Sequence, residues 1–170
     1  MKKNTVARLI VAIALCAAAK PLFANTLSVP PDKPAYTVDI PADWKPKSNK
    51  ADESVEAGDA ANHVYMAGWV VDKSDMKELT GDVEALLKDS MKSIDEKSSE
   101  ETIENNGIKF QVLKGSGVDK REGGKVKFFV AVFPAGAGKA GIYYVDYDAD
   151  APADVMNTIV KVMDSIKVKS

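Results

Sequence analysis

The stretch from residue 108 to residue 147 constrains the fold more than any other part of the chain. It predicts three consecutive β-strands, at Ile108–Val118, Val126–Phe133 and Gly141–Tyr147, because β-branched and aromatic residues dominate each run. The middle run is apolar enough for a strand that is covered on both faces. The segments between the runs contain the glycines that hairpin turns need. An antiparallel sheet is therefore expected.

Two amphipathic segments can cover such a sheet. Apolar residues recur every three or four positions from Met76 to Ile94, which predicts a helix of about five turns, with a break at Gly81 as an alternative. A second helix is expected after Pro152, with an apolar stripe centred on Ile159. Further strands are predicted at 36–40, 54–57, 63–71 and 102–105, with a surface loop at 45–52. The sequence thus favours the α+β class, with a mainly antiparallel β-sheet covered by two helices.

The first 24 residues have the composition of a signal peptide. Basic residues precede an apolar run at 9–19, which is too short to span a bilayer. Cleavage after Ala24 is favoured, and cleavage after Ala18 or Ala19 is the alternative. Lipid attachment at Cys16 is disfavoured because Leu15 is not a small residue. We expect a signal peptide at 1–24, an extended leader at 25–35 and a single domain at 36–170, in a periplasmic or secreted protein without stable membrane insertion.

The charge of the exported chain restricts its partners. Of the 23 basic residues four lie in the signal peptide, so 19 remain against 25 acidic ones, a formal net charge of −6. No basic stripe is present to neutralise phosphates, which argues against nucleic acid and against anionic lipid. The lone cysteine leaves with the signal peptide, which excludes a disulfide and thiol chemistry from the exported chain.

Polar motifs give weak candidates for a site. Asp146, Asp148 and Asp150 form a D-x-D-x-D run like the start of a calcium loop, but the glycine and the final glutamate of that loop are missing. We expect Asp146 and Asp148 to point outward, and we keep the three as weak metal candidates only. His63, the one histidine in the sequence, is expected to be exposed at a strand end. No catalytic residue and no cofactor are predicted.

Two further patterns have plain structural explanations. The glycine-rich segment 136–141 lacks the serine or threonine that follows the lysine of a phosphate-binding loop, so it is expected to be a hairpin tip. Most aromatic residues should pack in the core, on opposite faces where two are adjacent. Any that remain uncovered would form the best binding surface for another protein or a small ligand. The aromatic residues concerned are Trp44, Trp69, Phe128, Phe129, Phe133, Tyr143, Tyr144 and Tyr147.

The chain resembles the PsbP-like fold family of small bacterial envelope proteins. The resemblance is carried by Tyr36-x-Val38-x-Ile40-Pro41-x-x-Trp44, the acidic segment 72–75 before the long helix, Asn106-Gly107, and the segment 164–167 near the end. It implies an α-β-α layered arrangement around an antiparallel sheet. It also implies binding or assembly roles rather than a shared active site, and it supplies no catalytic residue.

These observations favour a secreted or periplasmic, non-enzymatic binding or accessory protein. An immunity or inhibitor protein of the envelope is an alternative that secretion and the acidic charge permit. A hydrolase that uses two carboxylates is less favoured, because it would need an acidic pair in a cleft. The partner and the oligomeric state are not predicted.

Overall fold

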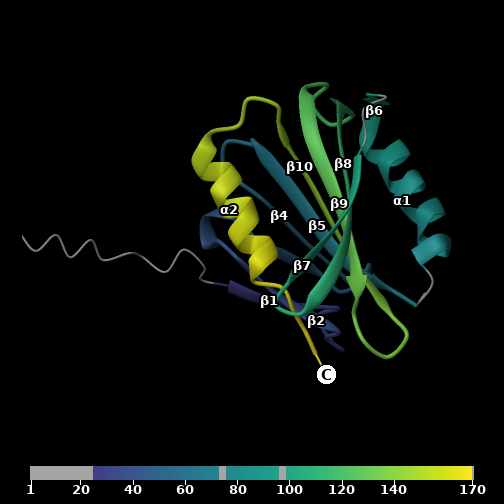
Figure 1. The fold of residues 1–170 in the computed structure, drawn as a ribbon. Coiled ribbons are helices and arrows are strands. Elements are labelled where there is room, and N and C mark those ends of the chain that lie inside the picture. The colour runs from purple at the N-terminus through teal and green to yellow at the C-terminus, as the bar shows by residue number, and fades with distance from the viewer. Residues whose placement is uncertain (1–24, 73–75, 96–98, 170) are drawn as a thin grey trace, which may run out of the picture.

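The computed structural model describes residues 25–72, 76–95 and 99–169. The predicted signal peptide lies outside these residues. Within the described part, the chain forms an antiparallel sheet of eight strands and a second sheet of three. The large sheet stands between α1 (Met76–Ser90) on one face and α2 (Ala153–Asp164) on the other (Figure 1). This is the predicted α+β architecture.

The three strands that dominate the sequence form the middle of the large sheet. Each of them extends one residue beyond its predicted bounds at one end or at both ends. All their pairings are antiparallel. Across the sheet the order is β3 (Lys47–Asn49), β4 (Ser54–Gly58), β5 (Val64–Val71), β10 (Ala140–Asp148), β9 (Lys125–Pro134), β8 (Ile108–Asp119) and β6 (Met91–Ile94). The strand β7 (Ser99–Asn105) also pairs with β8, on the same edge as β6 and next to it.

Alternation along the strands divides the core into two clusters. On β10, Tyr143 and Val145 face α2, whereas Ile142 and Tyr144 face α1, and all four are buried. Ile159 and Val162 of α2 are buried in the first cluster, as its apolar stripe predicts. The middle of the sheet is therefore covered on both faces, which explains the continuous apolar runs of its central strands.

The small sheet packs on the same face as α2. It is ordered β1 (Asn25–Val29), β2 (Tyr36–Ile40) and β11 (Lys167–Val168). Tyr36 inserts from β2 toward β5, where a side chain at Gly68 would collide with the Tyr36 hydroxyl. After β2, a 3-10 helix at Ala42–Trp44 turns the buried Trp44 back into the core, as expected.

Several local predictions were wrong. The first helix continues through Gly81, as its apolar stripe predicts, but it ends at Ser90 rather than Ile94, because residues 91–94 pair with β8 as β6. The expected loop at 45–52 contains the short edge strand β3. The leader at 25–35 is extended, but β1 pairs along its whole length with β2 and its Val29 is fully buried. In all three segments, pairing with another strand determines the structure. The segment 91–94 pairs with the more distant β8, whereas β1 and β3 each pair with the next strand of the chain.

Candidate functional site

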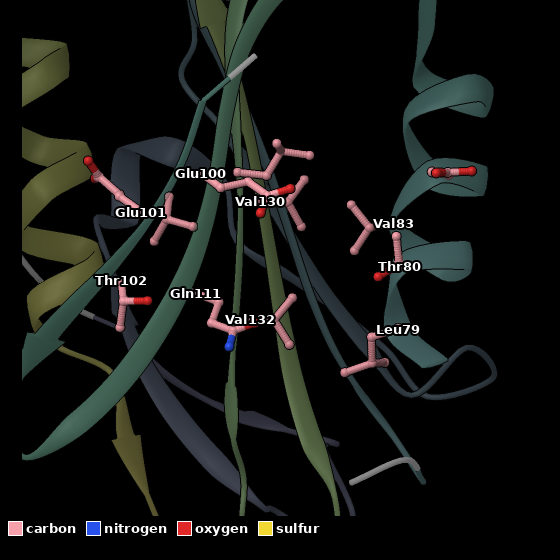
Figure 2. Close-up of a pocket in the computed structure, with 12 residues that line it drawn as sticks. Leu79, Thr80, Val83, Glu100, Glu101, Thr102, Gln111, Val130 and Val132 are labelled. Carbon is pink, nitrogen blue, oxygen red and sulfur yellow. The ribbon is translucent and has the colours of Figure 1, made fainter. Parts of the chain in front are cut away.

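The first helix leaves part of the sheet uncovered. Leu79 and Leu87 of α1 pack on β9 and β10, while β8 and β7 continue the sheet beyond the helix. The result is a half-open cleft of about 500 Å³ between α1 and the β7–β8–β9 side of the sheet (Figure 2). We call it the α1–β7 cleft. Its volume lies within the range of small-molecule binding pockets.

The α1–β7 cleft has an apolar floor and polar walls. The register places Glu100 opposite Leu113 and Thr102 opposite Gln111, so these four side chains share the face that looks toward α1. Val130 and Val132 of β9 continue the floor, and α1 forms the facing wall (Figure 2). The complete lining is Leu79, Thr80, Val83, Glu84, Glu100, Glu101, Thr102, Gln111, Val112, Leu113, Val130 and Val132.

The rim of the α1–β7 cleft is acidic. Glu84 on α1 and Glu100 on β7 are exposed on the two walls. Within the described residues neither of them forms an ion pair, whereas Glu101 pairs with Lys114. A cleft with an apolar floor and two carboxylates that form no ion pair with a described residue suits a ligand that has both an apolar part and a positive charge.

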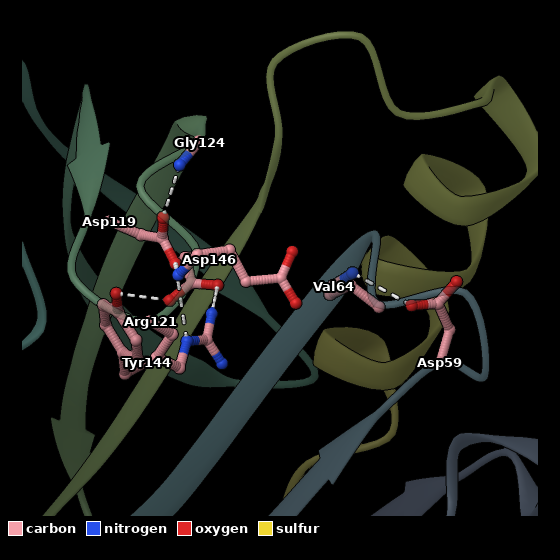
Figure 3. Close-up of polar contacts among 8 residues, drawn as sticks. Asp59, Val64, Asp119, Arg121, Gly124, Tyr144 and Asp146 are labelled. Atoms are coloured by element: carbon pink, nitrogen blue, oxygen red, sulfur yellow. Dashed lines mark hydrogen bonds and ion pairs between the residues drawn. The ribbon is translucent and has the colours of Figure 1, made fainter.

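A smaller concavity of about 220 Å³ lies at one end of β10, on a buried polar cluster. Asp146 accepts hydrogen bonds from Arg121 and from the Tyr144 hydroxyl, the latter at 2.7 Å (Figure 3). The Arg121 guanidinium also lies 4.3 Å from the centre of the Tyr65 ring. Asp119, also buried, accepts the Gly124 N–H at 2.8 Å. Each of these two carboxylates therefore already has hydrogen-bond partners within the fold.

Burial sets the protonation behaviour of this cluster. Loss of water raises the pKa of Asp146, and the Tyr144 hydrogen bond and the Arg121 charge partly offset that rise. Burial also raises the pKa of Tyr65 to about 12, and it raises the pKa of Tyr144 well above its usual value. The tyrosines remain neutral donors at physiological pH, and the cluster ties the β8–β9 turn to the sheet.

The D-x-D-x-D run is not brought together as a cation site. Asp146 is buried, contrary to the outward orientation expected for it, because it faces α1 and Arg121 reaches it. Asp148 is half-buried and Asp150 is exposed beyond the strand. Among the described residues, no group of three or more histidine, cysteine, aspartate or glutamate side chains is placed to hold a metal ion.

The structure also places the other residues that the sequence singled out. His63 is partly exposed, and its Nδ1 lies 3.1 Å from the Asp59 carboxylate, which also accepts the Val64 N–H. The segment 136–141 forms a hairpin tip in which Gly136 and Gly138 have positive φ. Of the eight aromatic residues singled out in the sequence, five are buried, and the three that are half-buried pack against the two core clusters. Those three are Trp69, Phe129 and Tyr147.

The residues of the α1–β7 cleft were missed by the sequence reasoning. Leu79 and Val83 were assigned correctly to the apolar stripe of the helix, but the stripe does not show how far the sheet extends beyond it. Ser99–Asn105 is so polar that only its last four residues were predicted as a strand. The signal available in the sequence was that, in a strand, Glu100 and Thr102 would face one side while Glu101 and Ile103 face the other.

Solved structures of low sequence identity share this architecture. Cyanobacterial PsbP from Synechocystis has a TM-score of 0.57 and 14% identity, over 92% of this chain and 99% of that one. The chain has the PsbP-like fold. Mog1p, a Ran-binding protein of Saccharomyces cerevisiae, has a TM-score of 0.52 and 15% identity, over 85% of this chain and 95% of its own. No protein-family model and no curated protein matches the sequence.

Two bacterial proteins of solved structure also share the architecture. LpqN, which is involved in cell envelope biogenesis of Mycobacterium tuberculosis, has a TM-score of 0.50 and 12% identity, over 79% of this chain and 83% of its own. A Bacteroides thetaiotaomicron protein has a TM-score of 0.51 and 9% identity, and this chain spans 45% of its length. At these identities the comparisons establish the fold alone. Neither described helix combines the length and apolar content required to cross a membrane.

Proposed function

We propose that this chain is an exported, non-enzymatic binding or accessory protein that holds its ligand in the α1–β7 cleft. The observation that carries the proposal is the cleft itself, an apolar floor on β8 and β9 between two walls that bear Glu84 and Glu100. Largely apolar concavities with a few polar groups are the usual form of a binding site. The fold agrees with such a role, since Mog1p, which shares it, is a Ran-binding protein.

A carboxylate-dependent hydrolase is the catalytic alternative for the same cleft. Glu84 and Glu100 lie on facing walls, so they are the acidic pair that such an enzyme would use. Both are exposed, however, and lack the apolar burial by which an acid of this kind is kept protonated. The geometry therefore supports ligand binding better than acid–base catalysis.

Export is supported by the sequence of residues 1–24, and the single domain would then begin with β1. The likeness to LpqN, an envelope biogenesis protein, is consistent with this location. Mass spectrometry of the exported protein is expected to give an N-terminus at Asn25 or a few residues earlier. Recovery of the full-length chain from the cytoplasm alone would contradict export.

The cleft can be tested with an uncharged apolar fluorophore, N-phenyl-1-naphthylamine. Its fluorescence should rise when it is titrated with the chain 25–170, because the dye leaves water for the cleft floor. Gln111→Trp, at an exposed position on the floor, should fill the space and abolish the rise. Lys127→Trp, exposed on the opposite face of β9, is the matched control and should leave binding unchanged. Equal binding by both variants would contradict the proposal.

A further inference from the structure

The outer wall of the α1–β7 cleft is the edge of a sheet. Within the described residues β7 pairs with β8 alone, so its second edge faces solvent. Asn105 and Ile108 flank a two-residue turn in which Asn106 and Gly107 have φ of 52° and 75°. Such a turn is closed by a hydrogen-bonded pair, and antiparallel ladders alternate from there. Alternate residues of β7 therefore direct their backbone N–H and C=O groups outward.

Those alternate residues are Glu100, Thr102 and Glu104, and the first two also line the cleft. A strand added along this edge would continue the sheet. Every second side chain of that strand would then stand on the cleft side, next to Glu100 and Thr102. Backbone pairing and occupation of the cleft can thus be achieved by the same extended segment.

The charge of β7 selects the kind of strand that can be added. Its seven residues contain three glutamates and no basic residue. A second copy of β7 would bring glutamates close to one another, and like charges across strands destabilise pairing. Glu101 is already matched by Lys114, but Glu100 and the facing Glu84 have no such partner among the described residues. A segment with lysine or arginine at alternate positions would supply the missing charge.

We propose that β7 accepts an extended segment of another protein, in which basic and apolar residues alternate, as an added strand beside the α1–β7 cleft. This inference rests on the proposed function and names the partner of that site. The basic side chains meet Glu100 and Glu84, and the backbone bonds with the outward groups of β7. Ile103, which is 39% exposed, offers an apolar contact on the other face of the same strand.

A direct test uses two blocked seven-residue peptides, one of alternating valine and lysine and one of alternating valine and glutamate. Isothermal titration should show binding of the lysine peptide to the chain 25–170, weakened by added salt, and no binding of the glutamate peptide. Thr102→Pro should weaken binding by at least about tenfold, because proline lacks the outward N–H yet is tolerated at a sheet edge. Thr102→Val keeps that N–H and therefore measures how much of the loss is due to the threonine side chain alone.

A second pair of variants keeps the inference testable should Thr102→Pro not fold. The double variant Glu100→Gln and Glu104→Gln should bind the lysine peptide several-fold more weakly and with less salt dependence. Glu53→Gln, at an exposed glutamate near the opposite edge of the sheet, should bind as the unmodified chain does. Strand addition would be overturned if either edge variant, Thr102→Pro or the double glutamine variant, bound the lysine peptide as tightly as the unmodified chain does.

The outcomes separate this inference from the proposed function. If the fluorophore occupies the cleft but the lysine peptide does not bind, strand addition is wrong and the cleft remains a binding site. If neither binds, both are wrong. Concentration-dependent self-association in sedimentation, abolished by Thr102→Pro, would identify a second copy of the chain as the occupant of the edge and would also overturn the inference.

Discussion

At the scale of single residues, Arg121 joins three strands that the sequence separates widely. It extends from the β8–β9 turn, forms an ion pair with Asp146 on β10 and stacks over Tyr65 on β5. Its Nε lies 3.7 Å from the buried Asp119, whose carboxylate also receives the Glu122 and Gly124 N–H groups. Buried carboxylates are tolerated only when they are paired in this way. The cluster therefore fixes the end of the sheet opposite to the hairpin tip at 136–141.

The raised pKa of Asp146 should make the free energy of unfolding depend on pH. Burial raises its pKa in the folded state, so the folded protein binds this proton more tightly than the unfolded chain. The stabilisation that the protonated Asp146 contributes is therefore fully present below the pKa of this group in the unfolded chain. It is lost as pH rises through the pKa of this group in the folded protein. The free energy of unfolding, relative to that of Asp146→Asn, should rise as pH falls from about 7 toward about 4. A difference that stays constant over this range would contradict the assignment.

Calcium is not expected to stabilise the chain. Both oxygens of Asp146 are already engaged, and Asp148 and Asp150 differ in their exposure. A ligand stabilises appreciably only well above its dissociation constant. Thermal unfolding should therefore have the same midpoint in chelator and in millimolar calcium. A calcium-dependent rise of several degrees that Asp148→Asn removes would show a cation site.

At the scale of secondary-structure elements, α2 is held by one face. Ile159 is 2% exposed in the core cluster, whereas its neighbour Val160 is 54% exposed. Ile159→Ala should lower the free energy of unfolding by about 2–5 kcal/mol, because a cavity remains. Val160→Ala should change it by less than about 0.5 kcal/mol. Chemical denaturation measures both, and equal losses would mean that α2 is not packed on this face.

The strand β1 should be needed for stability although it precedes the predicted domain. It pairs with β2 over five residues, and its Val29 is fully buried. Removing residues 25–34 should cost at least the burial of that side chain, about 1.5–3 kcal/mol. Differential scanning calorimetry should then show a lower melting temperature for the shortened chain. An unchanged melting temperature would restore the interpretation of this segment as a dispensable leader.

At the scale of the whole molecule, the sequence predicted the layers better than their edges. Central strands such as β9 and β10 carry continuous apolar runs, and Asn106-Gly107 marks its turn unambiguously. Edge strands have one free side and little burial, so β3 and the first three residues of β7 leave no apolar pattern. Because the cleft lies between a helix and such an edge, its position depends on pairing that one-dimensional periodicity does not contain.

We propose that the α1–β7 cleft, with the edge of β7, is the binding surface of the molecule. Backbone amide shifts of the isotope-labelled chain 25–170, recorded while the valine–lysine peptide is added, test it most directly. The largest shifts are expected in three segments, 79–84 of α1, 99–105 of β7 and 111–113 of β8. Shifts concentrated on α2 or around Arg121, or no shifts at millimolar peptide, would contradict it.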